Sequence, residues 1–185
     1  KRLRNSVEFW IKIKGIPFDY FWHYYSKSAL NSNQNNRNKE IFEFKDGRPV
    51  SQIYDLLYAK LFETFNKEDL CELTFVCVPA SSYFRNSRRY ESFSNEVCKK
   101  TGMRNGYFHI TIGEERTPKH STSTHVTEDI GYFLDRNFFK GALIVLFDDI
   151  VTTGQSIYDI KEMLEAAGAE VICAISIGKT IKLKV

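Results

Sequence analysis

The stretch LIVLFDDIVTTGQS, residues 143–156, is the most informative part of this sequence about its fold. It begins with an unbroken apolar run, Leu143 to Phe147, which is typical of a strand buried on both faces of a parallel sheet. Two carboxylates end that run, and a small, hydroxyl-rich turn follows. From Gln155 onward, apolar residues recur at steps of three and four until Gly168, which predicts a helix. The stretch therefore predicts a strand, an acidic pair, a turn and a helix in series.

That series suits a sugar phosphate. The amide N–H groups at a helix N-terminus lack intrahelical partners and lie at the positive end of the helix dipole, and a phosphate satisfies both demands. Gly154 allows the backbone to approach the ligand, and the hydroxyls of Thr152, Thr153 and Ser156 can add hydrogen bonds. The adjacent carboxylates would repel the phosphate, so they suit the vicinal hydroxyls of a ribose, or a divalent cation.

The run from Ile144 to Ser156 resembles, position by position, the phosphoribosyl-pyrophosphate (PRPP) signature of type I phosphoribosyltransferases. An ordinary acidic turn with a helix cap is the simpler alternative, but it does not require the whole series. The resemblance implies that PRPP is bound with Mg²⁺, held mainly by oxygens of PRPP itself, with Asp148 or Asp149 as its candidate protein ligands. The residues it assigns to the ribose and 5′-phosphate are Asp148, Asp149, Ile150, Val151, Thr152, Thr153, Gly154, Gln155 and Ser156.

A second loop of small residues follows the strand predicted at residues 73–78. In the resembled family, the loop at this place receives the pyrophosphate through backbone amides, and arginines supply charge. A solvated basic loop is the alternative for any one arginine. The residues assigned to pyrophosphate are Pro79, Ala80, Ser81, Ser82, Arg88 and Arg89.

Further segments resemble the competence-protein ComF-like branch of that family: Val78 to Tyr90, Arg116 to His120, Arg136 to Phe139 and Ile177 to Thr180. Ser92 to Asn95 stands where that branch usually has Gly-Phe-Asn-Gln, and the zinc ribbon common in the branch has no counterpart in this sequence. The region that normally helps to choose the acceptor, residues 1–50 here, resembles no family that we can name. The acceptor is therefore open.

Arg116 and Lys119 lie in a polar loop predicted at residues 113–127. A loop that closes over the bound sugar would exclude water, which competes for the activated carbon. An exposed loop with scattered charges is the alternative. Together with Asp148 and Asp149, these two residues form the expected catalytic set, and no general base is identified. His120 and His125, in the same loop, lack a partner at metal-ligand spacing.

The resemblance implies transfer of 5-phosphoribose from PRPP to a nitrogenous acceptor, with release of pyrophosphate. Two alternatives stay open: a catalytically silent module that senses PRPP or a nucleotide, and a role beside DNA-handling proteins by analogy with the ComF-like branch. The net charge of +3 does not support direct nucleic-acid binding. A homodimer is one oligomeric state that the resemblance leaves open.

Composition indicates a soluble globular protein, with 43% hydrophobic and 26% charged residues, and no apolar run approaches the roughly 20 residues that span a membrane. The cysteines at positions 77, 98 and 173 lie in apolar patterns and are expected to be buried thiols. Because Cys71 also lacks a C-x-x-C partner, we expect a reducing, cytoplasmic location.

Alternating strands and helices from residue 51 onward predict an α/β fold with a mainly parallel sheet flanked by helices, as in Rossmann-like type I phosphoribosyltransferases. We expect this core at residues 51–185 and a small N-terminal accessory or hood region at residues 1–50. The aromatic run 18–25 either packs in the core or stacks on an acceptor base. The other expected elements are a frayed end at 1–4, strands at 7–13 and 41–44, a loop at 31–38, a helix at 51–65 capped by Ser51, strands at 73–78 and 107–112, a basic loop at 85–89, helices at 90–101 and 128–139, and a strand at 170–177.

Overall fold

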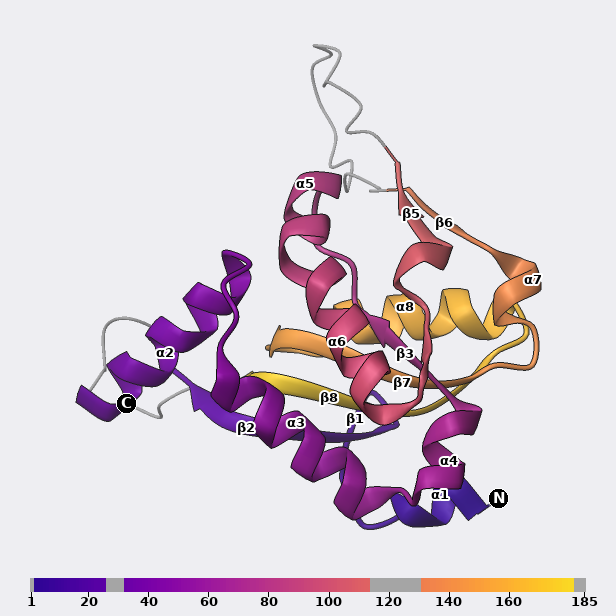
Figure 1. Cartoon of the computed structure of the whole chain (residues 1–185), viewed down its shortest axis with the longest axis horizontal. Coiled ribbons are helices and arrows are strands. Elements are labelled where there is room, and N and C mark those ends of the chain that lie inside the picture. Colours follow the sequence, from indigo (N-terminus) through magenta and orange to yellow (C-terminus); the bar gives the residue numbers. More distant parts are fainter. Residues whose placement is uncertain (1, 26–31, 114–130, 182–185) are drawn as a thin grey trace.

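The computed structural model describes residues 2–25, 32–113 and 131–181, and the side chains of residues 32–35 are not described. Its main feature is a six-stranded sheet (Figure 1). The strand order is β1 (Ile11–Ile13), β2 (Ile16–Tyr24), β8 (Glu170–Thr180), β7 (Leu143–Val151), β3 (Leu73–Cys77) and β4 (Arg104–Asn105). All neighbouring strands run parallel except β1 and β2, which form an antiparallel hairpin. The prediction of an α/β fold with a mainly parallel sheet is confirmed.

Helices flank the sheet, and they contribute to two separate hydrophobic clusters. One cluster contains residues of α1 (Arg2–Ser6), α2 (Ser32–Lys45), α3 (Ser51–Thr64), α4 (Lys67–Glu72) and α6 (Ser92–Thr101). The other contains residues of α7 (Arg136–Phe139) and α8 (Gln155–Ala166). Strand β7 contributes residues to both clusters: Val145 and Phe147 belong to the first, and Ile144 and Leu146 belong to the second. This two-sided burial explains its unbroken apolar run.

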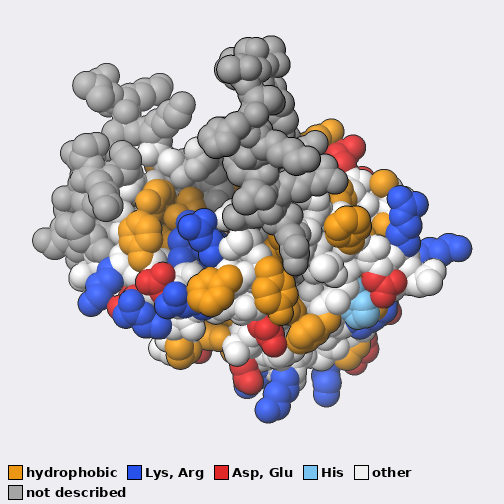
Figure 2. Space-filling view, turned by 90° about the horizontal axis from the view of Figure 1, so that it is seen from above, with side chains coloured by type: hydrophobic (Ala, Val, Ile, Leu, Met, Phe, Trp, Pro, Cys, Tyr) orange, Lys and Arg blue, Asp and Glu red, His pale blue; other side chains and the backbone are white. Residues whose placement is uncertain are grey.

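The remaining elements lie between β3 and β7 in the chain. They are α5 (Tyr83–Asn86), a π-helical turn (Ser87–Glu91), a 3₁₀ turn (Tyr107–His109), and strands β5 (Ile110–Ile112) and β6 (Tyr132–Leu134), which pair as a separate antiparallel hairpin. The face that carries α5 and this hairpin displays hydrophobic side chains (Figure 2). Tyr83, Phe84, Phe108 and Phe133 are each more than half exposed. Apolar surface therefore lies immediately beyond the second predicted ligand loop.

Residues from the first 50 positions contribute strands to the main sheet. Strand β2 pairs with β8 over most of its length, and Phe18 and Trp22 in it are buried, which favours the core-packing interpretation for these two aromatics. The domain boundary at residue 50 stays a prediction. The frayed end expected at residues 1–4 is wrong for the described part, because α1 buries Leu3 and Arg2 pairs with Asp69. The strand expected at 7–13 is reduced to β1.

Residues 32–45 form helix α2, so the loop predicted at 31–38 and the strand predicted at 41–44 are wrong over this range. Asparagine has a low helix propensity, and its abundance here favoured a loop. The buried residues nevertheless recur at helical spacing, since Asn38, Ile41 and Phe44 are each nearly inaccessible to solvent. The three-residue spacing of these positions was the feature of the sequence that could have predicted the helix.

The basic loop expected at residues 85–89 is also helical. Ser82 accepts a hydrogen bond from the Arg85 amide at 3.3 Å and so begins α5, which continues through the π-helical turn into α6. The helix expected at 128–139 is wrong where the structure describes it, because residues 132–134 form β6 and only residues 136–139 are helical. Asp135 caps that short helix through its bond with the Phe138 amide.

Smaller differences concern the ends of elements. The strand predicted at 107–112 is confined to Ile110–Ile112, and helix α3 begins after Val50 without a side-chain cap, so Ser51 is not its N-cap. Strands β3 and β8, and helices α3 and α8, are confirmed within a few residues. Three buried thiols are confirmed, with Cys71 exposed. No helix of the described ranges is both long and apolar enough to cross a membrane.

Candidate functional site

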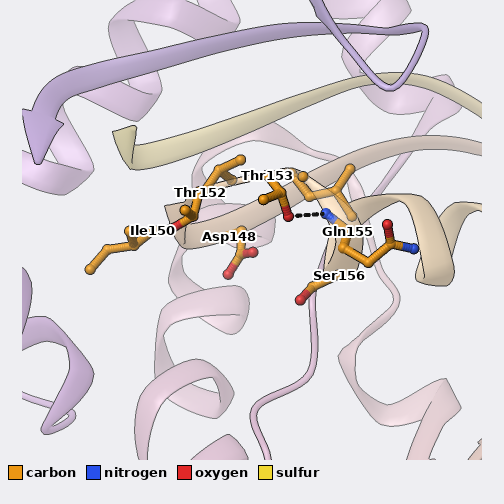
Figure 3. A pocket seen from close by; sticks show the side chains of 9 residues that line it. Asp148, Ile150, Thr152, Thr153, Gln155 and Ser156 are labelled. Carbon is orange, nitrogen blue, oxygen red and sulfur yellow. Dashed lines mark hydrogen bonds between the residues drawn. The ribbon is translucent and has the colours of Figure 1, made fainter. Parts of the chain in front are cut away.

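The end of β7, the following turn and the start of α8 enclose a pocket of about 130 Å³. Figure 3 shows the Asp148 carboxylate and the Ser156 hydroxyl on the same side of this turn. The pocket is lined by Asp148, Ile150, Val151, Thr152, Thr153, Gly154, Gln155, Ser156 and Ile157. The structure thus brings together nearly all the residues assigned from sequence to the ribose and 5′-phosphate, and adds Ile157. Asp149 is absent from this lining.

Helix α8 begins with amide groups that face the turn. Gly154 precedes it with φ of +81°, a left-handed conformation that side chains with a Cβ disfavour, and no side chain at this position caps the helix. Thr153 accepts a hydrogen bond from the Gln155 amide at 3.3 Å through its Oγ1 (Figure 3). An exposed helix N-terminus behind a glycine is suited to an anion.

Strand β8 fixes the other side of this turn. The Lys179 ammonium donates to the Thr152 carbonyl at 2.7 Å, and the hydroxyls of Thr152 and Thr180 lie 2.8 Å apart. The Thr152 side chain is therefore engaged with β8 rather than open to a ligand. Lys179 was not predicted to support the turn, because the last strand was expected to end at residue 177. Lys179 lies opposite Val151 in the register of β7 and β8, and this pairing places it next to the turn.

Residue Ile13 of strand β1 packs over the same turn. A Cβ added at Gly154 would lie 2.5 Å from Ile13 Cγ1, closer than real Cβ contacts. The hairpin at the start of the chain therefore closes the back of the predicted phosphate site.

We expect Gly154→Ala to weaken binding of a phosphorylated ligand about tenfold, because it strains the turn and collides with Ile13. In the double variant Ile13→Ala/Gly154→Ala, only the contact is relieved, so part of the affinity should return. Calorimetric titration with ribose 5-phosphate measures both effects, and unchanged affinity in the single variant would contradict this account of the turn.

The two carboxylates lie inside β7, which continues to Val151 instead of ending at them as the sequence predicted, and their surroundings differ. Asp148 is half-buried and faces the pocket, whereas Asp149 is only 5% exposed. Asp149 Oδ2 accepts from Arg89 Nη1 at 2.5 Å, and its Oδ1 lies 3.5 Å from Lys45 Nζ. Burial, and then the adjacent Asp149 carboxylate, raise the pKa of Asp148 well above its usual range. A ligand whose hydroxyl groups donate hydrogen bonds to Asp148 would offset the free-energy cost of burying its charge.

The loop after β3 lies at the same edge of the sheet, because β3 pairs in parallel with β7 from Leu73 to Cys77. The Asn86 side chain accepts from the Ala80 amide at 3.0 Å, and Arg85 Nη1 donates to Ser81 Oγ at 2.9 Å. Ser82 begins helix α5. Pro79 to Ser82 are therefore close to β7, as expected, but the Ala80 amide already has a partner.

The arginines assigned to pyrophosphate differ in their surroundings. Arg88 is exposed, and Arg89 is paired with Asp149. Arg85, which was not assigned a role, is exposed and lies at the predicted pyrophosphate loop through its bond with Ser81. The loop residues Arg116, Lys119, His120 and His125 lie outside the described residues. Their predicted roles stay predictions.

Within residues 2–25, 32–113 and 131–181, no group of three or more His, Cys, Asp or Glu side chains is placed to hold a metal ion. Asp148 is the acidic side chain that lines the pocket. Among the described residues, the pocket therefore offers a divalent cation one carboxylate side chain.

The sequence pattern of the phosphoribosyl transferase domain matches residues 42–185 of this chain. The chain is also 30% identical over 123 residues to a protein named Competence protein ComFC from Streptococcus pneumoniae (strain ATCC BAA-255 / R6). That alignment covers 63% of this chain and 54% of the relative, so the chain spans about half the length of the curated protein it matches. Both findings confirm the resemblance drawn from residues 144–156 and its ComF-like character.

Proposed function

This chain belongs to the phosphoribosyl transferase domain family, and on that premise we propose that it binds PRPP with Mg²⁺ and transfers the 5-phosphoribosyl group to a nitrogenous acceptor. One observation carries the proposal: the pocket presents the Asp148 carboxylate beside the N-terminus of α8, where Gly154 provides no side-chain cap. A ribose phosphate needs acceptors for its hydroxyl groups and a site for its anionic phosphate, and this pocket offers both.

The 5′-phosphate is proposed to occupy the turn from Thr152 to Ser156, where the amides at the start of α8 and the Thr153 and Ser156 hydroxyls can bind it. Lys179 and Ile13 hold this turn from behind. Asp148 would accept hydrogen bonds from the ribose hydroxyls. The pyrophosphate would lie toward Ala80 to Ser82, where Arg85 and Arg88 supply positive charge.

In the proposed reaction, the bond between ribose C1 and a pyrophosphate oxygen breaks, and its electron pair leaves with pyrophosphate. A lone pair on the acceptor nitrogen forms the new bond to C1, and the proton that this nitrogen loses passes to solvent or to the departing pyrophosphate. Mg²⁺, when bound with PRPP, would neutralise charge on the departing pyrophosphate. The residues present fit a cation held mainly by ligand oxygens, because Asp148 alone among the acidic side chains lines the described pocket. Water exclusion is proposed for Arg116 and Lys119.

A silent PRPP- or nucleotide-sensing module is the second candidate. It is favoured by the lining of the described pocket, in which Asp148 is the one titratable side chain. A sensor needs affinity but no residue that accepts the proton of the acceptor. A role beside DNA-handling proteins stays a proposal by analogy, since the chain corresponds to about half of the competence protein it matches.

We expect Asp148→Asn to weaken binding of PRPP with Mg²⁺ by roughly 10- to 100-fold, because a charged acceptor of the ribose hydroxyls is lost. Isothermal titration calorimetry measures this change. The control is Glu162→Gln on the exposed part of α8, which should bind like the parent protein. Equal affinity for PRPP in the Asp148→Asn variant would contradict the proposed site.

The experiment that separates enzyme from sensor is a screen of purine, pyrimidine and other nitrogenous bases for pyrophosphate release from PRPP with Mg²⁺. Release with one base supports transfer and identifies the acceptor class. Binding of PRPP without release with any base supports the sensing module. Absence of PRPP binding would refute both.

A further inference from the structure

Asp149 is fully engaged by the protein. Its Oδ2 receives the Arg89 guanidinium at 2.5 Å, and its Oδ1 receives the Ile150 amide at 2.6 Å and lies 3.5 Å from the Lys45 ammonium. The side chains of Asp149 and Arg89 are 7% and 15% exposed, so this ion pair is largely withdrawn from water. A carboxylate surrounded in this way has little capacity left for ribose hydroxyls.

The cations around Asp149 come from parts of the chain that are distant in sequence. Lys45 is the last residue of α2, and Arg89 lies in the π-helical turn between α5 and α6. Arg89 also donates through Nε to the Lys45 carbonyl at 3.4 Å, which places a positive charge at the C-terminal end of α2. The network therefore joins α2, the π-helical turn and the end of β7 at one point.

Close backbone packing supports the same junction. The chain leaves α2 through Gly47, whose φ is +76°, and a Cβ at this position would lie 2.2 Å from the Arg88 carbonyl oxygen. The Gly47 amide donates to the Phe44 carbonyl at 2.9 Å, which ends the helix. The end of α2 thus fits directly against the residue that precedes Arg89.

Asp148 presents the opposite case. Its Oδ1 accepts from the Asp149 amide at 2.8 Å, and the carboxylate borders the pocket. Two cations accompany Asp149, so the junction behind the pocket carries one net positive charge. Burial and the Asp149 carboxylate still raise the pKa of Asp148, and the nearby charges of Lys45 and Arg89 oppose this rise only in part.

We infer that Asp149 is a positioning residue, which Arg89 and Lys45 hold so that Asp148 alone of the acidic pair meets the sugar. The inference rests on the proposed function and refines it, since the ribose site then depends on Lys45, a residue of α2 that lies outside the signature at residues 144–156. Arg89 acts through Asp149 and not as a ligand of pyrophosphate.

Calorimetric titration with two separate probes tests this inference: ribose 5-phosphate, and pyrophosphate with Mg²⁺. Lys45→Met and Arg89→Met should each weaken the binding of ribose 5-phosphate about tenfold, because Asp149 near the end of β7 is no longer held in place. Both variants should leave the affinity for pyrophosphate unchanged. Lys45→Arg should restore most of the affinity for ribose 5-phosphate. The matched control is Lys39→Met, an exposed lysine on the same helix, which should bind both probes like the parent protein.

A double variant distinguishes an indirect from a direct role. If Lys45 acts through Asp149, then Lys45→Met should add little to the loss caused by Asp149→Asn, whereas independent contacts with the ligand would add. Circular dichroism verifies folding, and the Lys45 variants suffice if Arg89→Met does not fold.

Three results would overturn the inference while leaving the proposed function intact: unchanged ribose 5-phosphate affinity in Lys45→Met, additive losses in the double variant, or loss of pyrophosphate affinity in a folded Arg89→Met protein. If the parent protein binds PRPP with Mg²⁺ and the losses of affinity in the double variant are not additive, the inference is supported. If the parent protein binds none of these ligands, the proposed function itself fails.

Discussion

Gly47→Ala is expected to lower the free energy of unfolding by roughly 3 kcal/mol, which combines left-handed strain with overpacking against neighbouring backbone. The new Cβ would lie 2.2 Å from the Arg88 carbonyl oxygen, and backbone cannot rotate away as a side chain can. Either α2 or the π-helical turn must therefore move. For a chain of this size, such a loss corresponds to a decrease in Tm of about 6–12 °C, measurable by calorimetry.

The matched control is Gly141→Ala. Gly141 has nearly the same φ, +75°, but a Cβ at this position would meet no atom within 4 Å. We expect this variant to lose only about 1 kcal/mol, the cost of the left-handed conformation. Similar losses in the two variants would show that the contact with Arg88 does not hold the end of α2 in place.

Gly47→Ala should also affect the ligand site at a distance. Displacement of the turn after α2 moves Lys45 and Arg89 relative to Asp149, so affinity for ribose 5-phosphate should fall together with stability. Gly141→Ala lies away from this junction and should retain affinity. This difference separates a specific effect on the site from general destabilisation.

Phe147→Ala is expected to destabilise the protein by about 3–5 kcal/mol, the usual cost of removing a buried aromatic ring. Phe147 is inaccessible to solvent, and its ring centroid lies 4.8 Å from that of Phe93 and 5.8 Å from that of Phe75. Phe44 of α2 approaches the same ring at 6.1 Å. Denaturant unfolding monitored by fluorescence and circular dichroism measures the loss.

Two further substitutions calibrate this result. Phe147→Leu keeps most of the buried volume and should cost less than about 2 kcal/mol. Phe133→Ala removes a ring that is 68% exposed, so its effect should stay within about 0.5 kcal/mol. A small effect of Phe147→Ala would mean that the aromatic cluster beneath Asp148 is not what holds the carboxyl end of β7.

Local sequence patterns were sufficient to predict the elements at the centre of the fold. The apolar run before Asp148 predicted a strand buried on both faces, and apolar residues at three- and four-residue steps predicted α3 and α8, because such patterns depend on near neighbours in the chain. The turn at Gly154 could be predicted for the same reason. The strand, the turn and the helix are consecutive in the chain, so covalent connectivity places them next to one another. For this reason the candidate ligand-binding segment was recognisable from sequence.

Local signals misled where composition and periodicity disagreed. Asparagines at residues 31–38 favoured a loop, but Ile41 and Phe44 bury one face of α2 against the sheet, and this packing outweighs low propensity. The arginines at 85–89 indicated a solvated loop, whereas Ser82 starts a helix there. Tertiary packing decides such segments.

Sequence alone predicts which segment is suited to a sugar phosphate, because that segment is continuous and its chemistry is local. The difference between the two carboxylates depends on tertiary packing. Lys45 and Arg89 lie far from Asp149 along the chain and meet it because α2 and the π-helical turn pack at the end of β7. Ile13 reaches Gly154 for the same kind of reason. Contacts of this range depend on the packing of helices and strands around the sheet, which no local pattern encodes.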